Sequence, residues 1–422
     1  MEQLNDGKIE KAVLAGLNAD VFTREETATD ASLDELEALL ETAGGTCAAK
    51  LLQNRHAPDP HSFLGEGKAQ ELKELIANEE ADLAIFDNEL SPSQIRALEE
   101  ILEVPVLDRS ALILDIFAQR AKTREGRLQV ELAQYKYLLP KLSGMGKSMS
   151  RLGGGIGTRG PGETKLETDR RHIRERMGRL EQELREVRQV RAVQRRQRQK
   201  NSVPVAALVG YTNAGKSTIL NALTDAGIPA NNRLFDTLDT TTRQLTVSDT
   251  LSVLLSDTVG FISKLPHHLV EAFKATLEEL AYADLLIHVI DASDPEREAH
   301  IRVVEQLISQ LAKEDTPVVL CYNKCDLADP AELPRDREAV FLCAKTGEGK
   351  QELLDAIEAH LSKGQHHAKF LLPYSMGGQV EKLHKTAKVI TCDYTGQGIE
   401  IEVICDAETF GRLGDCLLEE LP

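Results

Sequence analysis

Hydrophobic residues in the first quarter of the chain alternate between short apolar runs and amphipathic stretches. Apolar runs of strand length occur at residues 12–17, 47–53, 81–86 and 104–107. Stretches with helical spacing lie between them, at residues 32–41, 67–78 and 91–102. This alternation is typical of βαβ units, so we predict a small parallel α/β domain over residues 1–110. Gly65, Gly67 and Lys68 lack the spacing of a phosphate loop, and we interpret them as a turn that opens a helix.

The pattern changes to long helical repeats after residue 110. One set of apolar positions recurs at helical spacing, at Leu128, Leu132, Tyr135 and Leu139. A second set recurs at alternating intervals of four and three, at Ile173, Met177, Leu180, Leu184 and Val187. Two such seams predict an antiparallel helical hairpin over residues 111–200. Its tip, residues 143–163, contains eight glycines together with Lys147, Arg151 and Arg159.

Apolar strand-like runs return after residue 201 and each ends in a polar motif. They lie at residues 203–209, 251–255, 318–322 and 340–342. This arrangement predicts a doubly wound α/β sheet of the P-loop GTPase type over residues 201–365. The tail, 366–422, has strand patterns at 387–392 and 399–404 and a helix from Ala407, so we predict a small α+β domain after a linker at 364–367.

The first of these runs ends in a P-loop, followed by the helix-forming stretch 218–223. Its residues are Gly210, Tyr211, Thr212, Asn213, Ala214, Gly215, Lys216 and Ser217. Glycines let backbone N–H groups surround phosphates, and the helix N-terminus adds partial positive charge. We expect Lys216 to bridge the β- and γ-phosphates and stabilise their charge, and the Ser217 hydroxyl to ligate Mg²⁺.

Two later strand ends complete the pattern of a guanine-nucleotide site. The second run ends in Asp257, Thr258, Val259 and Gly260, where Asp257 is expected to hold Mg²⁺ through water and the Gly260 N–H to meet the γ-phosphate. The third ends in Asn323, Lys324, Cys325 and Asp326. A carboxylate accepts both guanine donors, N1–H and N2–H₂, which adenine does not offer. Asp326 is therefore expected to select GTP and GDP, with Lys324 packed on the ring.

Two loops remain to be assigned to this site. Cys343, Ala344 and Lys345 fit the loop whose backbone N–H reaches guanine O6, although Ser is usual at the first position. A threonine-rich loop begins with Phe235, Asp236, Thr237, Leu238 and Asp239. A threonine of this loop completes the Mg²⁺ shell when the γ-phosphate is present. We select Thr237 because its Phe-x-Thr-Leu setting matches related GTPases, with Thr241 as the alternative.

No catalytic residue is identified by these motifs. Phe261 follows Gly260 at the position where many GTPases carry the Gln that orients the attacking water, so intrinsic hydrolysis is expected to be slow. Asn213 stands where some GTPases bind a potassium ion in place of an arginine finger, which makes K⁺ a second candidate cofactor.

Charge and cysteine content set further limits. The formal net charge is −18, yet residues 164–200 hold thirteen Lys/Arg against six Asp/Glu. This local basic excess beside a Gly-rich tip favours RNA contact, although a solvated helix face is the commoner origin of a charge run. Seven scattered cysteines and no apolar run long enough to span a bilayer predict a cytoplasmic protein without an integral membrane segment.

Several long motifs resemble the HflX family of ribosome-associated GTPases. They are the sequence GGGIGTRGPGETKLETDRR at 153–171, GRLQVELAQY at 126–135, the P-loop, and the stretch 257–266. The resemblance implies a protein that binds the large ribosomal subunit and its rRNA, hydrolyses GTP with stimulation by the ribosome, and splits or rescues stalled ribosomes under stress. A monomer is the default for this architecture.

Two other functions remain open at this stage. The chain could be a GTP-dependent switch that binds RNA or protein during ribosome assembly with little turnover. A membrane-associated regulator of a protease has weak support, because no amphipathic anchor or lipidation motif is visible.

Overall fold

A computed structural model of the chain describes residues 10–23, 26–142, 161–199, 203–224, 227, 234–235, 240–248, 251–264, 280–331, 333–334, 339–362 and 365–421. Within this part the chain forms two compact units. The first contains residues 10–187 with 234–235 and 259–264, and the second contains 188–227, 240–258 and 280–421. Two short segments next to the nucleotide motifs therefore belong to the N-terminal unit. The four domains predicted above are finer than these two units, and their boundaries stay a prediction.

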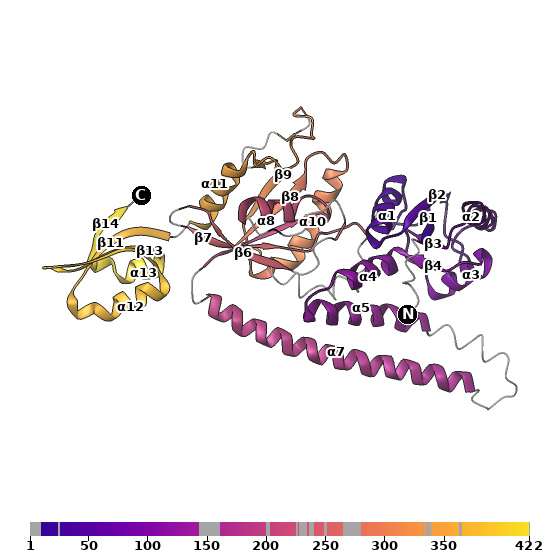
Figure 1. Cartoon of the computed structure of the whole chain (residues 1–422), viewed down its shortest axis with the longest axis horizontal. Coiled ribbons are helices and arrows are strands. Elements are labelled where there is room, and N and C mark those ends of the chain that lie inside the picture. Colours follow the sequence, from indigo (N-terminus) through magenta and orange to yellow (C-terminus); the bar gives the residue numbers. More distant parts are fainter. Residues whose placement is uncertain are drawn as a thin grey trace. The chain divides into compact units, whose positions relative to one another are not determined.

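The N-terminal unit begins with a parallel sheet in the order β2-β1-β3-β4 (Figure 1). Its strands are β1 (Lys11–Ala19), β2 (Thr46–Arg55), β3 (Leu83–Phe86) and β4 (Val106–Asp108). Its helices are α1 (Asp30–Ala43), α2 (Glu66–Glu79), α3 (Pro92–Leu102) and α4 (Arg109–Arg120). Capping boxes at Thr29 and Ser91 begin α1 and α3, which explains why these helices start where they do. Gly65 caps α2, so the interpretation as a helix-opening turn is confirmed.

Two long helices, α5 (Arg124–Leu142) and α7 (Pro161–Gln199), form the predicted hairpin. Arg124 pairs with Glu183 at 3.2 Å and Arg176 with Glu131 at 2.7 Å, so the residue number rises along α5 as it falls along α7. The helices are therefore antiparallel. The apolar seam contains Leu128, Leu132, Tyr135, Met177, Leu180, Leu184 and Val187. Lys147, Arg151 and Arg159 lie outside the described residues.

The second unit contains a six-stranded sheet in the order β10-β9-β8-β5-β7-β6. Its strands are β5 (Val205–Gly210), β6 (Thr241–Thr246), β7 (Ser252–Asp257), β8 (Leu285–Asp291), β9 (Val318–Asn323) and β10 (Val340–Phe341). Only β6, at one edge, runs antiparallel to its neighbour. Helices α8 (Lys216–Thr224) and α11 (Lys350–Leu361) share one hydrophobic cluster, and α10 (Arg297–Leu311) contributes Ile301 to another. Helices therefore pack on the sheet through two separate hydrophobic clusters, which confirms the predicted doubly wound sheet.

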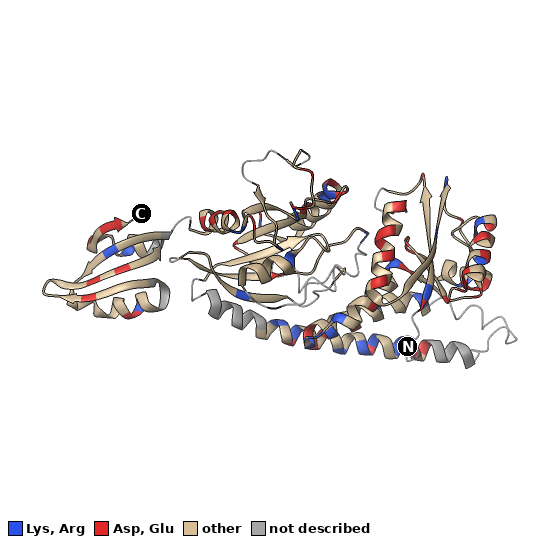
Figure 2. Ribbon diagram, turned by 45° about the horizontal axis from the view of Figure 1, so that its top comes forward, with Lys and Arg blue, Asp and Glu red and all other residues tan. Residues whose placement is uncertain are grey.

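The tail forms a separate four-stranded antiparallel sheet in the order β12-β13-β11-β14. Figure 2 shows the acidic and basic positions on its elements. Its elements are β11 (Gln365–Leu372), α12 (Gly377–Thr386), β12 (Lys388–Thr395), β13 (Gly398–Asp406), α13 (Ala407–Arg412) and β14 (Leu417–Leu421). This is a split βαβ arrangement of the ferredoxin-like kind. The predicted linker is wrong for residues 365–367, which pair with β13. These polar residues belong to a strand because His366 stacks on Phe410 and His367 contacts Glu402.

No helix in the described part of the chain has the length and apolar character needed to cross a membrane.

Candidate functional site

The predicted P-loop joins β5 to α8, and two of its glycines are required by close approach. A Cβ on Gly210 would lie 2.2 Å from the carbonyl oxygen of Val289 in β8. Gly215 has φ +97°, and a Cβ there would lie 2.2 Å from Nδ2 of Asn323. Neither position accepts a side chain without movement of the backbone around it. Asn213, at φ 60°, is the other residue of this loop in the left-handed region.

Lys216 is buried at the start of α8 and lies against the loop itself. Its Nζ donates to the carbonyl oxygens of Gly210 at 2.9 Å and Tyr211 at 2.7 Å. Burial lowers the pKa of Lys216 to about 8, and the charge of Asp257 opposes this shift. A cation held on two carbonyls in a dry site is poised to pair with an anion that enters the loop.

Ser217 and Asp257, the two residues expected to hold Mg²⁺, contact each other directly. The Ser217 hydroxyl donates to Oδ2 of Asp257 at 2.7 Å, and the register of β5 with β7 places Leu208 opposite Asp257. Hydroxyl and carboxylate oxygens are the hard ligands that Mg²⁺ prefers, so this pair fits the ion. The next residue, Thr258, donates from its hydroxyl to the Leu208 carbonyl at 2.6 Å, which fixes the strand end.

Asn323 connects two loops that the sequence treated as separate motifs. Its Nδ2 donates to the Ala214 carbonyl at 2.9 Å, and its Oδ1 accepts from the Ala344 N–H at 3.0 Å. The side chain of Asn323 is buried, as are Cys343 and Ala344. The P-loop and the 343–345 loop are therefore held together by one amide, a role that the motif match alone did not reveal.

Lys324 and Asp326 follow Asn323 at the end of β9 and are less buried. Lys324 has φ 61° and its Nζ lies 2.6 Å from Oδ2 of Asp291, at the end of the neighbouring strand β8. Asp326 is exposed. The proposed base selector is therefore exposed, whereas Lys216 of the phosphate loop is buried.

The threonine-rich loop is described only in part. Phe235 is buried and its ring packs edge-on against Phe117, with centroids 4.7 Å apart. The N–H of Leu234 donates to the Thr42 hydroxyl at 3.2 Å. Asp236, Thr237, Leu238 and Asp239 lie outside the described residues. Thr241 lies in β6 opposite Asp257, and the choice between it and Thr237 stays a prediction.

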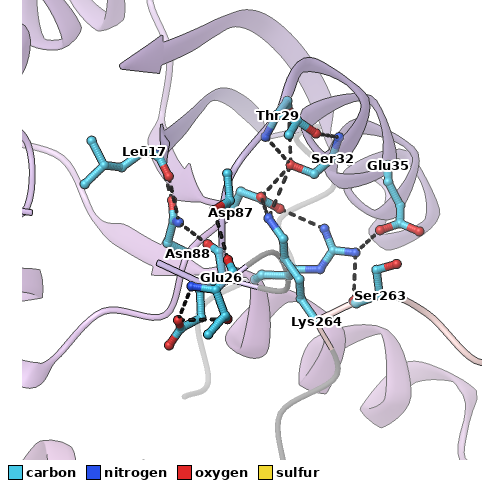
Figure 3. Close-up of polar contacts among 12 residues, drawn as sticks. Leu17, Glu26, Thr29, Ser32, Glu35, Asp87, Asn88, Ser263 and Lys264 are labelled. Atoms are coloured by element: carbon cyan, nitrogen blue, oxygen red, sulfur yellow. Dashed lines mark hydrogen bonds and ion pairs between the residues drawn. The ribbon is translucent and has the colours of Figure 1, made fainter. Parts of the chain in front are cut away.

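A buried polar cluster, formed by Glu35, Asp87, Arg109 and Lys264, lies in the N-terminal unit (Figure 3). Asp87 Oδ1 accepts from Arg109 at 2.8 Å, and Oδ2 accepts from the Ser32 hydroxyl at 2.7 Å and pairs with Lys264. Glu35 pairs with the other side of the Arg109 guanidinium. Burial lowers the pKa of Lys264, and the charge of Asp87 opposes the shift.

This cluster attaches the chain just beyond Gly260 to the N-terminal unit. Arg109 donates to the Ser263 carbonyl at 3.2 Å, and Lys264 itself follows Gly260 by four residues. Sequence reasoning missed the cluster. The available signals were the polar residue Asp87 directly after β3 and Arg109 directly after β4.

Three family models match consecutive parts of the chain. They are described as GTP-binding GTPase N-terminal, at residues 30–118, GTP-binding GTPase Middle Region, at 120–198, and 50S ribosome-binding GTPase, at 205–324. A GTP-binding protein from Sulfolobus solfataricus, solved in complex with GDP, aligns with 84% of this chain and 99% of its own at 22% identity and a TM-score of 0.43.

Curated relatives match over most of their length. GTPase HflX of Lacrimispora saccharolytica is 47% identical over 398 residues, which cover 94% of each chain. GTPase HflX of Caldanaerobacter subterraneus is 48% identical over 96% of this chain and 94% of its own. GTPase HflX of Escherichia coli K12 is 45% identical over 84% of this chain and 83% of its own. On these matches, and with the P-loop and strand-end motifs brought together in one sheet, the chain belongs to the HflX family of GTPases.

Proposed function

We propose that this GTPase binds the large ribosomal subunit in the cytoplasm as a monomer, hydrolyses GTP there, and splits or rescues stalled ribosomes. The observation that carries the proposal is the match of residues 205–324 to a model described as a 50S ribosome-binding GTPase. The buried Phe261 beside Gly260 supports a need for an outside group to order the attacking water.

In this proposal the nucleotide lies across the ends of β5, β7 and β9. Lys216 and the P-loop N–H groups bind the phosphates, and Asp326, Lys324 and the 343–345 loop bind guanine. Ser217, Asp257 and Thr237 are the residues that would hold Mg²⁺, which would supply charge stabilisation at the phosphates. Asn213 is assigned to a K⁺ ion, and equal hydrolysis rates in KCl and NaCl would contradict that assignment.

We assign rRNA contact to α7 and the glycine-rich tip that precedes it. Four Lys/Arg residues of α7 follow residue 190, where the helix has no acidic residue: Arg191, Arg195, Arg196 and Arg198. Between residues 167 and 190 basic and acidic side chains are nearly balanced, and Arg176 is already paired with Glu131. Attraction to RNA phosphates would therefore concentrate at the two ends of this region.

The test is the GTPase rate with and without purified large subunits, for the wild type and for Arg151→Glu/Arg159→Glu. We expect stimulation by subunits in the wild type and a loss of most of it in the variant, with the rate without ribosomes unchanged. The matched control is Arg302→Glu/Lys313→Glu, which reverses two exposed charges in and after α10 and should keep the stimulation.

Two outcomes separate the alternatives. Binding to subunits that depends on GTP but brings no increase in turnover would support the assembly switch instead. Stimulation that survives in Arg151→Glu/Arg159→Glu would remove the tip from the ribosome contact.

A further inference from the structure

Tyr211, the second residue of the P-loop, is held at both its backbone and its ring. Its carbonyl accepts from Lys216 Nζ at 2.7 Å and from the Ala214 N–H at 3.3 Å. Its ring stacks on the imidazole of His300 in α10, with centroids 3.6 Å apart and an interplanar angle of 12°. Tyr211 is 8% exposed, so the stacked ring lies in a largely buried position.

His300 is itself fixed by the loop that precedes α10. Its Nδ1 lies 2.8 Å from Oδ2 of Asp294, whose Oδ1 accepts from the Glu296 N–H at 2.8 Å. Burial alone raises the pKa of Asp294, but the contacts with His300 and the Glu296 N–H outweigh it and bring the pKa below its ordinary value. Asp294 therefore stays a carboxylate at neutral pH and orients the imidazole.

The same loop also supports the base-recognition side of the site. Asp291, at the end of β8, pairs with Lys324 at 2.6 Å and accepts from the Ser293 N–H at 3.0 Å. The Ala292 N–H donates to the Asn323 carbonyl at 2.8 Å. Residues 291–300 thus touch the P-loop through His300 and the guanine motif through Asp291.

We propose that His300 is a positioning residue for nucleotide binding. Its ring, oriented by Asp294, fixes Tyr211 and with it the carbonyl on which Lys216 rests before phosphate arrives. A P-loop rich in glycine must be ordered when it binds phosphate, and a side-chain anchor at its second residue lowers that ordering cost. The proposal rests on the P-loop as the phosphate site of the proposed function, and no nucleotide motif includes His300.

The experiment compares full-length wild type with His300→Ala and His300→Phe in fluorescence titrations with GDP and GTP in magnesium buffer. His300→Ala removes the stack and should weaken both nucleotides by about threefold to tenfold, the range for an aromatic pair. His300→Phe keeps a flat ring on Tyr211 and should bind within about twofold of the wild type. The kcat at saturating GTP should change by less than about twofold in both, because the effect lies on binding.

The tail offers a matched control. His366 stacks on Phe410 with centroids 4.1 Å apart and pairs with Glu420 at 2.7 Å, so His366→Ala removes the same kinds of contact away from the nucleotide. We expect its GDP affinity to equal that of the wild type.

Three results would overturn the inference. They are unchanged affinity in His300→Ala, affinity in His300→Phe as low as in His300→Ala, and an equal loss in His366→Ala. If the wild type itself bound neither GDP nor GTP, the P-loop assignment would fall together with the inference, and that outcome is distinguishable from the other three.

Discussion

The N-terminal sheet is parallel and the six-stranded sheet is parallel except for its edge strand β6, and the two use the polar residues at the carboxyl ends of their parallel strands in opposite ways. At the ends of β5, β7 and β9, glycines and backbone groups form a loop around the buried Lys216, and a single amide, Asn323, links two loops. At the ends of β3 and β4, the side chains of Asp87 and Arg109 pair with each other and with Glu35 and Lys264 (Figure 3).

The comparison shows that a parallel sheet gathers polar groups at its carboxyl edge but does not decide their use. A ligand requires accessible backbone N–H groups, which the glycines of the P-loop supply. A polar cluster that binds no ligand requires side chains that pair with one another. In the N-terminal sheet such pairs hold Ser263 and Lys264, which follow the Asp257–Gly260 motif in the chain.

The largest effect is expected from Gly215→Ala. The new Cβ meets Nδ2 of Asn323 at 2.2 Å in a backbone conformation that suits only glycine, so strain and a broken buried hydrogen bond act together. GDP affinity should fall roughly 100- to 1,000-fold. Calorimetric titration measures it, and a loss below tenfold would show that Asn323 moves aside freely.

Asp87→Asn tests the paired cluster of the N-terminal sheet. The change leaves the buried cations Arg109 and Lys264 with less compensating charge, so the free energy of unfolding should fall by about 3 kcal/mol. Urea unfolding followed by circular dichroism measures this value. Glu103→Gln, which removes the exposed pair with Lys73 at 2.7 Å, is the control and should leave the free energy of unfolding nearly unchanged. Equal losses of unfolding free energy in Asp87→Asn and Glu103→Gln would contradict the assignment of a stabilising role to the buried cluster.

His288 gives the second sheet its own pH dependence. The imidazole lies in β8 and is 1% exposed, and its Nδ1 has no hydrogen-bond partner among the residues that the structure describes. Burial, with a smaller effect of Lys216, lowers the pKa of His288 to about 4. Between pH 6.5 and 4 the unfolded chain therefore binds the proton more readily, and stability falls as the pH falls.

Removing the imidazole of His288 should make the free energy of unfolding depend less on pH at acidic pH. Between pH 6.5 and 4.5 the wild type should lose about 2 kcal/mol more unfolding free energy than His288→Leu. Denaturant unfolding at several pH values measures both slopes. His384→Ala, at an exposed position in α12, should keep the wild-type slope, and a His288→Leu slope equal to the wild type would refute the assignment.

The smallest effect is expected from Gly67→Ala in the glycine-containing turn of the N-terminal sheet. A Cβ at Gly67 meets nothing within 4 Å, and the residue lies in the first turn of α2. The substitution should raise unfolding free energy by about 0.5–1 kcal/mol and leave GDP affinity unchanged. A loss of GDP affinity would mean that this turn takes part in nucleotide binding after all.

The sequence determined the elements and the nucleotide motifs because both depend on local patterns. Apolar runs located the four strands of the N-terminal sheet and four of the six strands of the second sheet, but β6 and β8 were not predicted. The spacing of Leu128, Leu132, Leu180 and Leu184 located the hairpin seam. The motifs of the P-loop, Asp257 and Asn323–Asp326 each follow a strand, so their meeting at one sheet edge followed from topology. The linker prediction failed because residues 365–367 are polar, although they pair in a sheet that has one open face.

Only the tertiary structure decided which residues far apart in the sequence would support those motifs. Lys264 pairs with Asp87 across 177 positions, and Tyr211 in the P-loop stacks on His300 in α10. Each of these side chains is an ordinary polar or aromatic residue in its own segment, and its partner is set by how strands are ordered and how loops return to their ends. Local sequence patterns and motif spacing cannot predict such long-range contacts. The two side chains come close enough to interact only after the chain has folded.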